Sequence, residues 1–333
     1  MKSKDEVERL VYEILSILRE NKQEGPMGAT AIARKLEEEG FEIGERAVRY
    51  HLKHLDEKGL TEKAGPRKGR TITDAGEEEL ETELVGERVG FIHGKIKELV
   101  YEMTFNLQNN EGTIIGNVSF LSKDDLNEAL EIMKEVVDNG WAPSDYIKIL
   151  DEGKMMGNKK VPMGKAGVMT VCSVSIDGIL ENNGIPVSPR FGGVLEIEQE
   201  EPRRFTDAIS YEGTSIDPLE IFASKRMTSY LDVLKSGSGK ILANIREIPV
   251  PSRTKALEII EDAEGVGFDG VLKLGRPGGS LFGLPVGVNR VGVVIAGGIN
   301  SAVAVEEAGI EVESKAMGCV LKFSEMRELE EYL

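Results

Sequence analysis

The apolar positions in the first sixty residues follow a helical period and predict three short helices. Their apolar side chains recur three or four positions apart, which is typical of helices with one buried face. Val48, Leu52 and Leu55 form such a stripe in the third helix, and Gly59 is expected to end it. We therefore expect these three side chains to lie in the core of a small domain. The predicted helices span residues 5–21, 29–39 and 45–59.

After Gly59 the pattern changes to two short strands around a turn. The tip reads Gly-Pro-Arg-Lys-Gly over residues 65–69, and Gly-Pro and Gly are turn residues, so a β-hairpin is expected. An acidic helix should begin near Asp74. Helix, helix, turn, helix and hairpin is the order of a winged helix-turn-helix. We assign this domain to residues 1–85.

The rest of the chain predicts a second domain. Residues 86–112 are expected to form a connecting segment that begins with a helix, and residues 113–333 alternate aliphatic strands, glycine-rich turns and helices. The predicted fold class is therefore α+β, with a winged helix followed by an α/β effector domain.

Two stretches of the second domain resemble each other. GIPVSPRFGGVL (184–195) and GLPVGVNRVGVVI (283–295) align with one gap and share Gly-x-Pro-Val and an arginine, Arg190 or Arg290. Chance similarity between Gly/Val-rich strands is one explanation, but the shared arginine and proline favour an internal duplication. A duplicated domain commonly leaves a cleft between its halves, which is a natural place for a small ligand.

Charge distinguishes the third predicted helix from the rest of the chain. The formal net charge is −17, yet residues 44–70 hold eight basic and four acidic side chains, which is +4 and leaves the remainder at −21. Arg46, Arg49, Tyr50 and Lys53 fall opposite the apolar stripe, as in a recognition helix that presents donors to bases and phosphates. A basic face on an acidic protein favours a specific anionic partner.

The expected partner of this surface is double-stranded operator DNA, bound by a dimer at an inverted repeat. An ordinary solvated helix face is the alternative for the helix alone, and a winged helix that binds protein or RNA stays open. The order of elements and the basic wing favour DNA. The candidate DNA-binding residues are Arg46, Arg49, Tyr50, Lys53, Arg67, Lys68 and Arg70.

Anion-binding features also occur in the second domain. Asp217 and Pro218 are expected to cap a helix, which would gather backbone N–H groups near its start. Arg190 and Arg290 could clamp carboxylates, although pairing with a nearby Asp or Glu is an equal alternative. The candidate effector-binding residues are Arg190, Gly213, Thr214, Ser215, Arg290, Asn300 and Ser301.

Catalytic and membrane motifs are missing from the sequence. GVGFDG (265–270) follows a predicted helix and precedes a strand, the reverse of a dinucleotide-binding turn. Three histidines and two cysteines form no zinc spacing, and Cys172 and Cys319 are expected to be buried free thiols. No apolar run approaches the roughly 20 residues of a membrane span. We expect a cytoplasmic protein that is not an enzyme and holds no cofactor or metal.

The sequence resembles the archaeal nitrogen-regulatory repressor family, NrpR. The resemblance covers nearly the whole chain and is carried by IGERAVRYHLKHLDEKGL, GTSIDPLEIF, GRPGGSLFGLPVG and VVIAGGINSAVAVEEAGI. It implies a homodimeric or tetrameric repressor of nitrogen-fixation and ammonia-assimilation genes, released from its operator by 2-oxoglutarate, a dianionic regulatory ligand. Some members carry two effector domains, whereas this chain has room for one. A co-regulator adaptor whose winged helix contacts transcription proteins is the alternative function, and an enzyme with a DNA-binding appendage is a third class.

Overall fold

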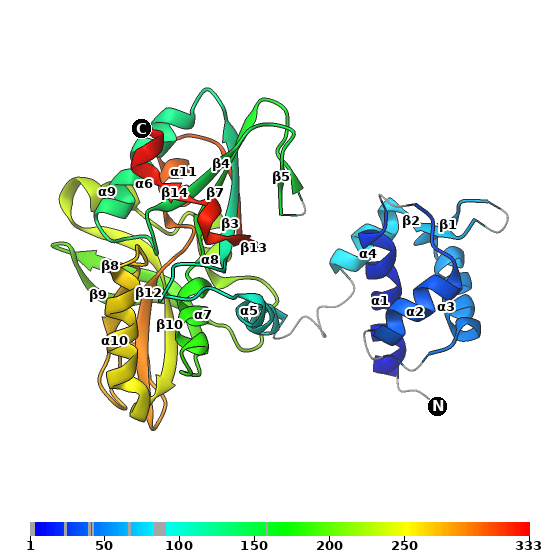
Figure 1. Ribbon diagram of the computed structural model, residues 1–333, viewed down its shortest axis with the longest axis horizontal. Helices are drawn as coiled ribbons and strands as arrows, with labels where there is room; N and C mark the ends of the chain where they lie inside the picture. The colour runs from blue at the N-terminus through cyan, green and yellow to red at the C-terminus, as the bar shows by residue number, and fades with distance from the viewer. Residues whose placement is uncertain are drawn as a thin grey trace. The chain divides into compact units, whose positions relative to one another are not determined.

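The structure is a computed structural model of the chain, and it forms two compact units, residues 1–89 and 90–333 (Figure 1). The predicted boundaries near residue 85 fall outside the described residues. The structure describes residues 4–22, 25–38, 41, 43–65, 68–82, 91–157 and 159–333.

The first unit has the predicted winged-helix order. Val48, Leu52 and Leu55 are at most 2% exposed and pack with apolar side chains of the other helices, so the predicted stripe is confirmed. The elements are α1 (Lys4–Glu20), α2 (Ala29–Glu38), α3 (Glu45–Glu57), β1 (Thr61–Lys63), β2 (Arg70–Ile72) and α4 (Asp74–Thr82).

The hairpin is attached to the chain ahead of α2. Met27 and Arg70 exchange two backbone hydrogen bonds of 2.9 Å. Gly69 has a φ of +89°, and a Cβ there would lie 2.5 Å from the carbonyl of Met27. Only glycine combines this left-handed backbone with so close an approach. The base of the wing is therefore held against the helices.

The second unit contains two five-stranded antiparallel sheets, with the strand orders β13-β3-β7-β4-β14 and β11-β12-β10-β8-β9. The strands of the first sheet are β3 (Thr113–Ser122), β4 (Tyr146–Leu150), β7 (Lys165–Val171), β13 (Val312–Lys322) and β14 (Arg327–Glu328). Those of the second are β8 (Ser188–Glu198), β9 (Glu201–Ser210), β10 (Gly239–Pro249), β11 (Val271–Leu274) and β12 (Arg290–Ala296). A separate small hairpin pairs β5 (Met155–Met156) with β6 (Lys159–Lys160).

Helices surround the two sheets. They are α5 (Phe91–Glu102), α6 (Leu126–Asp138), α7 (Val174–Asn182), α8 (Pro218–Ser224), α9 (Tyr230–Ser236), α10 (Arg253–Glu264) and α11 (Asn300–Glu307). Short 3-10 turns are η1 (Val250–Ser252), η2 (Phe323–Glu325) and η3 (Leu329–Tyr332).

The second unit is built from two copies of one strand–helix pattern. β3, α6, β4, β7, α7 and β8 are matched in the same order by β10, α10, β11, β12, α11 and β13. We name residues 113–198 the first half and residues 239–322 the second half. The sequence Ala-Leu-Glu-Ile occurs at equivalent places in α6 and α10, and Asn117 of β3 matches Asn244 of β10. The internal duplication is therefore present in the fold.

Each half gives its last strand to the sheet of the other half. β13 pairs with β3 and β8 pairs with β10, so the orders β13-β3-β7-β4 and β8-β10-β12-β11 are equivalent. The registers agree as well, because Glu313 pairs with Phe120 and Ser188 with Glu247. This exchange interlocks the halves.

The alignment that we expected from the sequence is out of register. Residues 184–195 lead into β8, the last strand of the first half, whereas residues 283–295 lead into β12, the third strand of the second half. Counted along the strands from Ser188 and Glu313, Arg190 aligns with Lys315, although Arg190 lies in a bulge of β8 and Lys315 pairs with Val118. The counterpart of Arg290 is Lys165. Gly/Val-rich strands match at several registers, and only the strand order distinguishes them.

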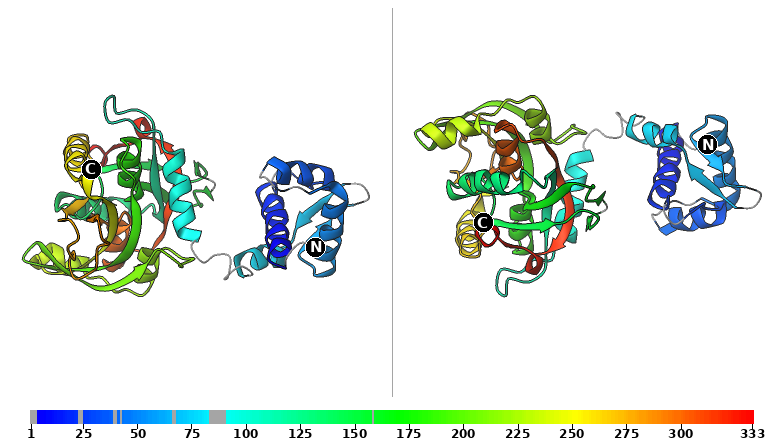
Figure 2. Two further views of the ribbon diagram at one scale, coloured as in Figure 1. Left: turned by 90° about the horizontal axis from the view of Figure 1, so that it is seen from below. Right: turned by 90° about the horizontal axis from the view of Figure 1, so that it is seen from above.

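The helices follow the same symmetry. α6 and α11 cover one face of the first sheet, and α7 and α10 cover the corresponding face of the second. On the opposite face of the first sheet, Ile92, Ile96 and Val100 anchor α5 in the core. Figure 2 shows α5, in cyan, lying along the strands of the first sheet. The described part of the expected connecting segment thus packs into the second unit.

Candidate functional site

The outer face of α3 is open to solvent. Arg46, Arg49, Tyr50 and Lys53 are exposed, with Arg49 and Lys53 side chains at 69% and 75%. Arg49 contacts Glu45 and Lys53 lies 3.7 Å from Glu57, each one helical turn away. Exposed pairs of this kind are worth about 0.5 kcal/mol, so phosphates can displace them at little cost.

The structure describes two of the three candidate DNA-binding residues of the wing. Lys68 is exposed, and Arg67 lies outside the described residues. The Arg70 Nε donates to both carboxylate oxygens of Asp56 at 3.0 Å, and its side chain is only 18% exposed. Arg70 therefore fastens the hairpin to α3, and we reassign it from DNA contact to positioning of the wing.

Arg190 is neutralised within the protein. Its Nη1 donates to Glu212 at 3.1 Å, and its Nε lies 3.5 Å from the nearly buried Glu247. The alternative of an internal ion pair is thus what the structure supports for Arg190. Arg290 begins β12, on the other side of β10 from Arg190. The two arginines do not form a symmetric pair, because they occupy different places in the duplication.

The turn before α8 has the predicted cap. The buried Asp217 side chain accepts a hydrogen bond of 2.7 Å from the Leu219 N–H, and Pro218 is the first helical residue. Burial raises the pKa of Asp217 from 3.8 to about 6. The hydroxyl of Thr214 donates to the Ile216 carbonyl, while Gly213 is exposed. Ser215 is half-buried in the same turn.

The second predicted turn is internal. Asn300 and Ser301 are at most 4% exposed, and the Asn300 amide donates to the carbonyls of Trp141 and Leu242 at 2.7 and 3.0 Å. Its counterpart Ser175 donates in the same way to the Ile115 carbonyl at 2.8 Å. This position therefore joins the start of α11 to β10 in the second half, and the start of α7 to β3 in the first half.

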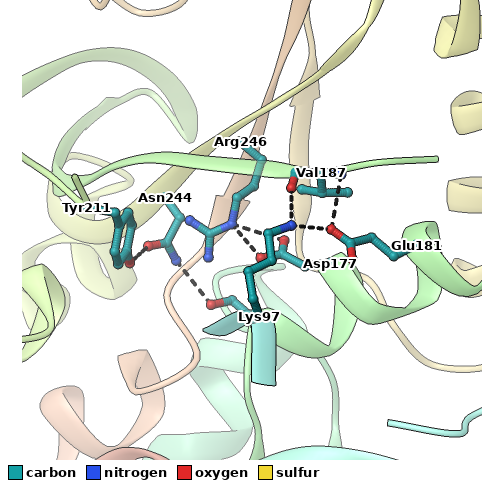
Figure 3. A network of polar contacts seen from close by, with 8 residues as sticks. Lys97, Asp177, Glu181, Val187, Tyr211, Asn244 and Arg246 are labelled. Carbon is teal, nitrogen blue, oxygen red and sulfur yellow. Dashed lines mark hydrogen bonds and ion pairs between the residues drawn. The ribbon is translucent and has the colours of Figure 1, made fainter. Parts of the chain in front are cut away.

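A buried polar network that no sequence pattern predicted crosses between the halves (Figure 3). Arg246 of β10 is fully buried, and its Nε lies 3.0 and 2.7 Å from the two carboxylate oxygens of Asp177 in α7. Its guanidinium carbon lies 5.0 Å from the centre of the Tyr211 ring. Burial opposes the charge of Arg246, but Asp177 and Tyr211 outweigh it and raise its pKa, so it stays charged. The Tyr211 hydroxyl donates to Asn244 at 2.5 Å.

The asparagines at equivalent positions tie the halves together. Asn244 donates to the Ser173 hydroxyl of the first half at 3.1 Å, and Asn117 donates to the Gly298 carbonyl of the second half at 2.8 Å. Figure 3 also shows Lys97 of α5, which bonds Glu181 and the Val187 carbonyl. α5 is therefore attached to the same helix, α7, that holds Asp177.

Among the cavities on the described part of the second unit are three whose walls contain none of the predicted effector residues. One of about 490 Å³ lies beside the ends of α8 and α11, near Arg226 and Glu307. An open groove of about 860 Å³ follows the base of the β8–β9 hairpin. The third, of about 300 Å³, lies between α5 and β13 and includes Lys95 and Lys315.

Other features bear on cofactors and membranes. Within the described part of the chain, no three His, Cys, Asp or Glu side chains are placed to share a metal ion. No helix in the described ranges is both long and apolar enough to cross a bilayer. Cys172 and Cys319 are buried free thiols, as predicted.

Comparison with known proteins identifies the family. Residues 89–328 match the family model described as NrpR regulatory domains NRD1 and 2, and residues 12–80 match the Ribonuclease R winged-helix domain. The Global nitrogen regulator NrpRI of Methanosarcina mazei is 42% identical over 324 residues, which covers 97% of this chain and 99% of that protein. The chain belongs to the NrpR family.

Further NrpR relatives are longer. Global nitrogen regulators NrpR of Methanocaldococcus jannaschii and Methanococcus maripaludis are 34% and 33% identical, over 97% and 91% of this chain but 56% and 52% of their own lengths. The crystal structure of a nitrogen repressor-like protein from Methanococcus jannaschii has a TM-score of 0.62 and 31% identity, covering 72% of this chain and 98% of that one. The chain is thus a nitrogen-regulating transcriptional regulator and not an enzyme.

Proposed function

We propose that this chain is a cytoplasmic repressor of nitrogen-assimilation and nitrogen-fixation genes, which binds an inverted-repeat operator as a homodimer and is released by 2-oxoglutarate. The observation that carries the DNA part is the outer face of α3. Arg46, Arg49, Tyr50 and Lys53 project from a helix whose opposite face is fixed in the core, as groove recognition requires. Their acidic neighbours are solvated and can be displaced.

Operator recognition can be tested by fluorescence anisotropy with an inverted-repeat duplex from a nitrogen-gene promoter and a scrambled duplex. Arg49→Ala should lose about 1–3 kcal/mol on the operator and little on the scrambled duplex, because a base contact is read only in the right sequence. Arg19→Ala, an exposed arginine at the end of α1, is the matched control. Equal loss on both duplexes would reduce Arg49 to a phosphate contact.

Release by the effector can be tested on the preformed complex. Adding 2-oxoglutarate should lower the anisotropy, because a ligand that prefers the unbound geometry shifts the population away from DNA. Unchanged operator affinity would refute the switch. Sedimentation of the complex gives its subunit number and distinguishes the expected homodimer from a tetramer.

The adaptor alternative predicts a different result in the first experiment. Tyr50 is 60% exposed and its ring meets His54 edge-on at 4.7 Å, so α3 also offers an aromatic surface suited to protein contact. If the unmodified protein bound neither duplex, the adaptor function would be favoured over direct operator binding.

A further inference from the structure

The cavity under α5 combines apolar walls with two cationic side chains. Its volume is about 300 Å³, and it is lined in part by Leu99, Phe120 and Met156. Lys95 enters from α5 and Lys315 from β13. Cavities of this size with a few polar groups suit small metabolites.

The positive charge of Lys95 is only partly compensated within the protein. Burial and, after it, the neighbouring Lys315 lower the pKa of Lys95, because each disfavours its positive charge, and the attraction of Glu220 and Asp217 does not offset them. Among the described residues, no hydrogen bond or ion pair joins Lys95 or Lys315 to a carboxylate. The third lysine of the cavity, Lys159, is already paired with Glu313 at 3.2 Å.

Other groups in the wall do not supply the missing charge. Glu98 and Glu102 lie on the exposed side of α5, where water screens them. Burial raises the pKa of the Cys319 thiol to about 11, so this group is neutral at physiological pH. Lys95, which is half-buried, and Lys315, which is exposed, therefore line an apolar cavity without an ion-pair partner among the described residues.

The internal duplication offers a direct comparison for Lys315. Its counterpart Arg190 is neutralised by Glu247 of the adjacent strand β10. The position equivalent to Glu247 is Phe120, as the pairings of Ser188 with Glu247 and of Glu313 with Phe120 show. The first sheet thus keeps the basic residue and replaces its carboxylate with an apolar wall.

A bulge in β13 shapes the same cavity. The register with β3 is interrupted between Lys315 and Cys319, and Met317 adopts a φ of +51°. The N–H groups of Ala316 and Met317 are bonded by Glu220 and Asn117, at 2.8 and 3.2 Å. Bulges of this kind re-aim side chains beside binding sites.

We propose that this cavity binds a small dianion, a dicarboxylate or a phosphate, between Lys95 and Lys315. The inference rests on the proposed function in one respect: the dianion that releases DNA acts here and not at Arg190 and Arg290. The bound anion replaces the repulsion between α5 and β13 with attraction. α5 is the first described helix after the winged-helix unit, so this site lies in the part of the second unit that is nearest in sequence to the DNA-binding helices.

Isothermal titration calorimetry of the full chain, without DNA, tests the site. The probes are 2-oxoglutarate and inorganic phosphate. Lys95→Gln and Lys315→Gln should each weaken binding of the preferred probe at least tenfold, while Lys273→Gln, which removes an exposed charge on β11, leaves it unchanged. Binding of neither probe by the unmodified chain, or equal binding by all variants, overturns the proposal.

The operator titration separates this inference from the proposed function. If 2-oxoglutarate releases DNA equally well from the two lysine variants, the cavity is excluded while the switch stands. If a probe binds in a lysine-dependent manner but leaves operator affinity unchanged, the anion site stands and the switch is excluded. Tighter binding of phosphate than of 2-oxoglutarate identifies phosphate as the occupant.

Discussion

At the centre of β3 the first half of the second unit carries Ser119, and at the same place in β10 the second half carries Arg246. The partner of Arg246, Asp177 in α7, has Ala302 as its counterpart in α11. One half therefore buries an ion pair where the other has a hydroxyl and a methyl group. Strand order is nevertheless the same, and the register agrees from Ser188 and Glu313 as far as the bulges of β8 and β13.

This difference separates what the fold requires from what one half adds to it. Backbone contacts recur, since the N–H groups of Cys172 and Gly297 donate to the Ile115 and Leu242 carbonyls at 2.9 Å in both halves. Buried charges do not recur. The charges are thus not needed to build the sheet, and each is a candidate for regulation or for specificity of packing.

The largest expected effect comes from breaking the buried ion pair. Asp177→Ala leaves Arg246 without a counter-charge and should cost about 3–5 kcal/mol of unfolding free energy. Asp177→Ala with Arg246→Ser reproduces the residues of the other half and should cost less than the single change. Urea unfolding followed by Trp141 fluorescence reports the second unit, because Trp141 is the only tryptophan. A double variant weaker than the single one would contradict this interpretation.

The next effect concerns Asp217, a second buried acid near Arg246. Its pKa is 3.8 in its ordinary state and about 6 in the fold, so the folded protein binds the proton more tightly. Stability should therefore fall by about 3 kcal/mol as the pH rises through this window. Asp217→Asn keeps an oxygen for the Leu219 N–H and should remove this part of the pH dependence. Asp262→Asn, on the exposed face of α10, is the control, and an unchanged profile in Asp217→Asn would contradict the assignment.

Substitutions of the equivalent asparagines Asn117 and Asn244 should lower the unfolding free energy by different, moderate amounts. Asn117→Ala leaves the Met317 N–H without its bond and the Gly298 carbonyl with only the longer bond from the Thr170 hydroxyl, and should cost about 1–3 kcal/mol. Asn244→Ala frees hydroxyls that can reorient and should cost about 1 kcal/mol. The same fluorescence measurement ranks them, and the reverse order would show that the second half depends more on its network.

The smallest changes in unfolding free energy should come from substituting Arg190 and Lys315. Arg190→Met removes a pair with the nearly buried Glu247 and should cost about 1 kcal/mol. Lys315→Met removes no pair and should change the unfolding free energy by less than about 0.5 kcal/mol. A large loss in Lys315→Met, measured without added anions, would mean that this lysine already has an internal partner.

The predictions from sequence succeeded where structure is local. The stripe of Val48, Leu52 and Leu55 and the cap at Asp217 depend on residues a few positions apart, and both are confirmed. The duplication was inferred correctly but at the wrong register. The repeated Ala-Leu-Glu-Ile of α6 and α10 and the matched Asn117 and Asn244 were the signals that could have fixed it.

The candidate sites show the same division. The exposed face of α3 follows from helical periodicity. Arg70, in contrast, was predicted to contact DNA, and only the fold shows that it forms an ion pair with Asp56. Arg246 was not predicted as a site residue, because a single arginine in an aliphatic strand follows no recognisable sequence pattern. Its partner Asp177 lies 69 positions away.

The sequence by itself determined the helices, the hairpin, the solvated basic face and the family resemblance, because each depends on neighbouring residues or on short motifs. The tertiary structure decided which strands exchange between the halves, which basic residues meet a carboxylate, and where a cavity leaves two lysines unpaired. These depend on contacts between segments far apart in the chain. Charge neutralisation is a property of such contacts, and no periodicity in the sequence specifies it.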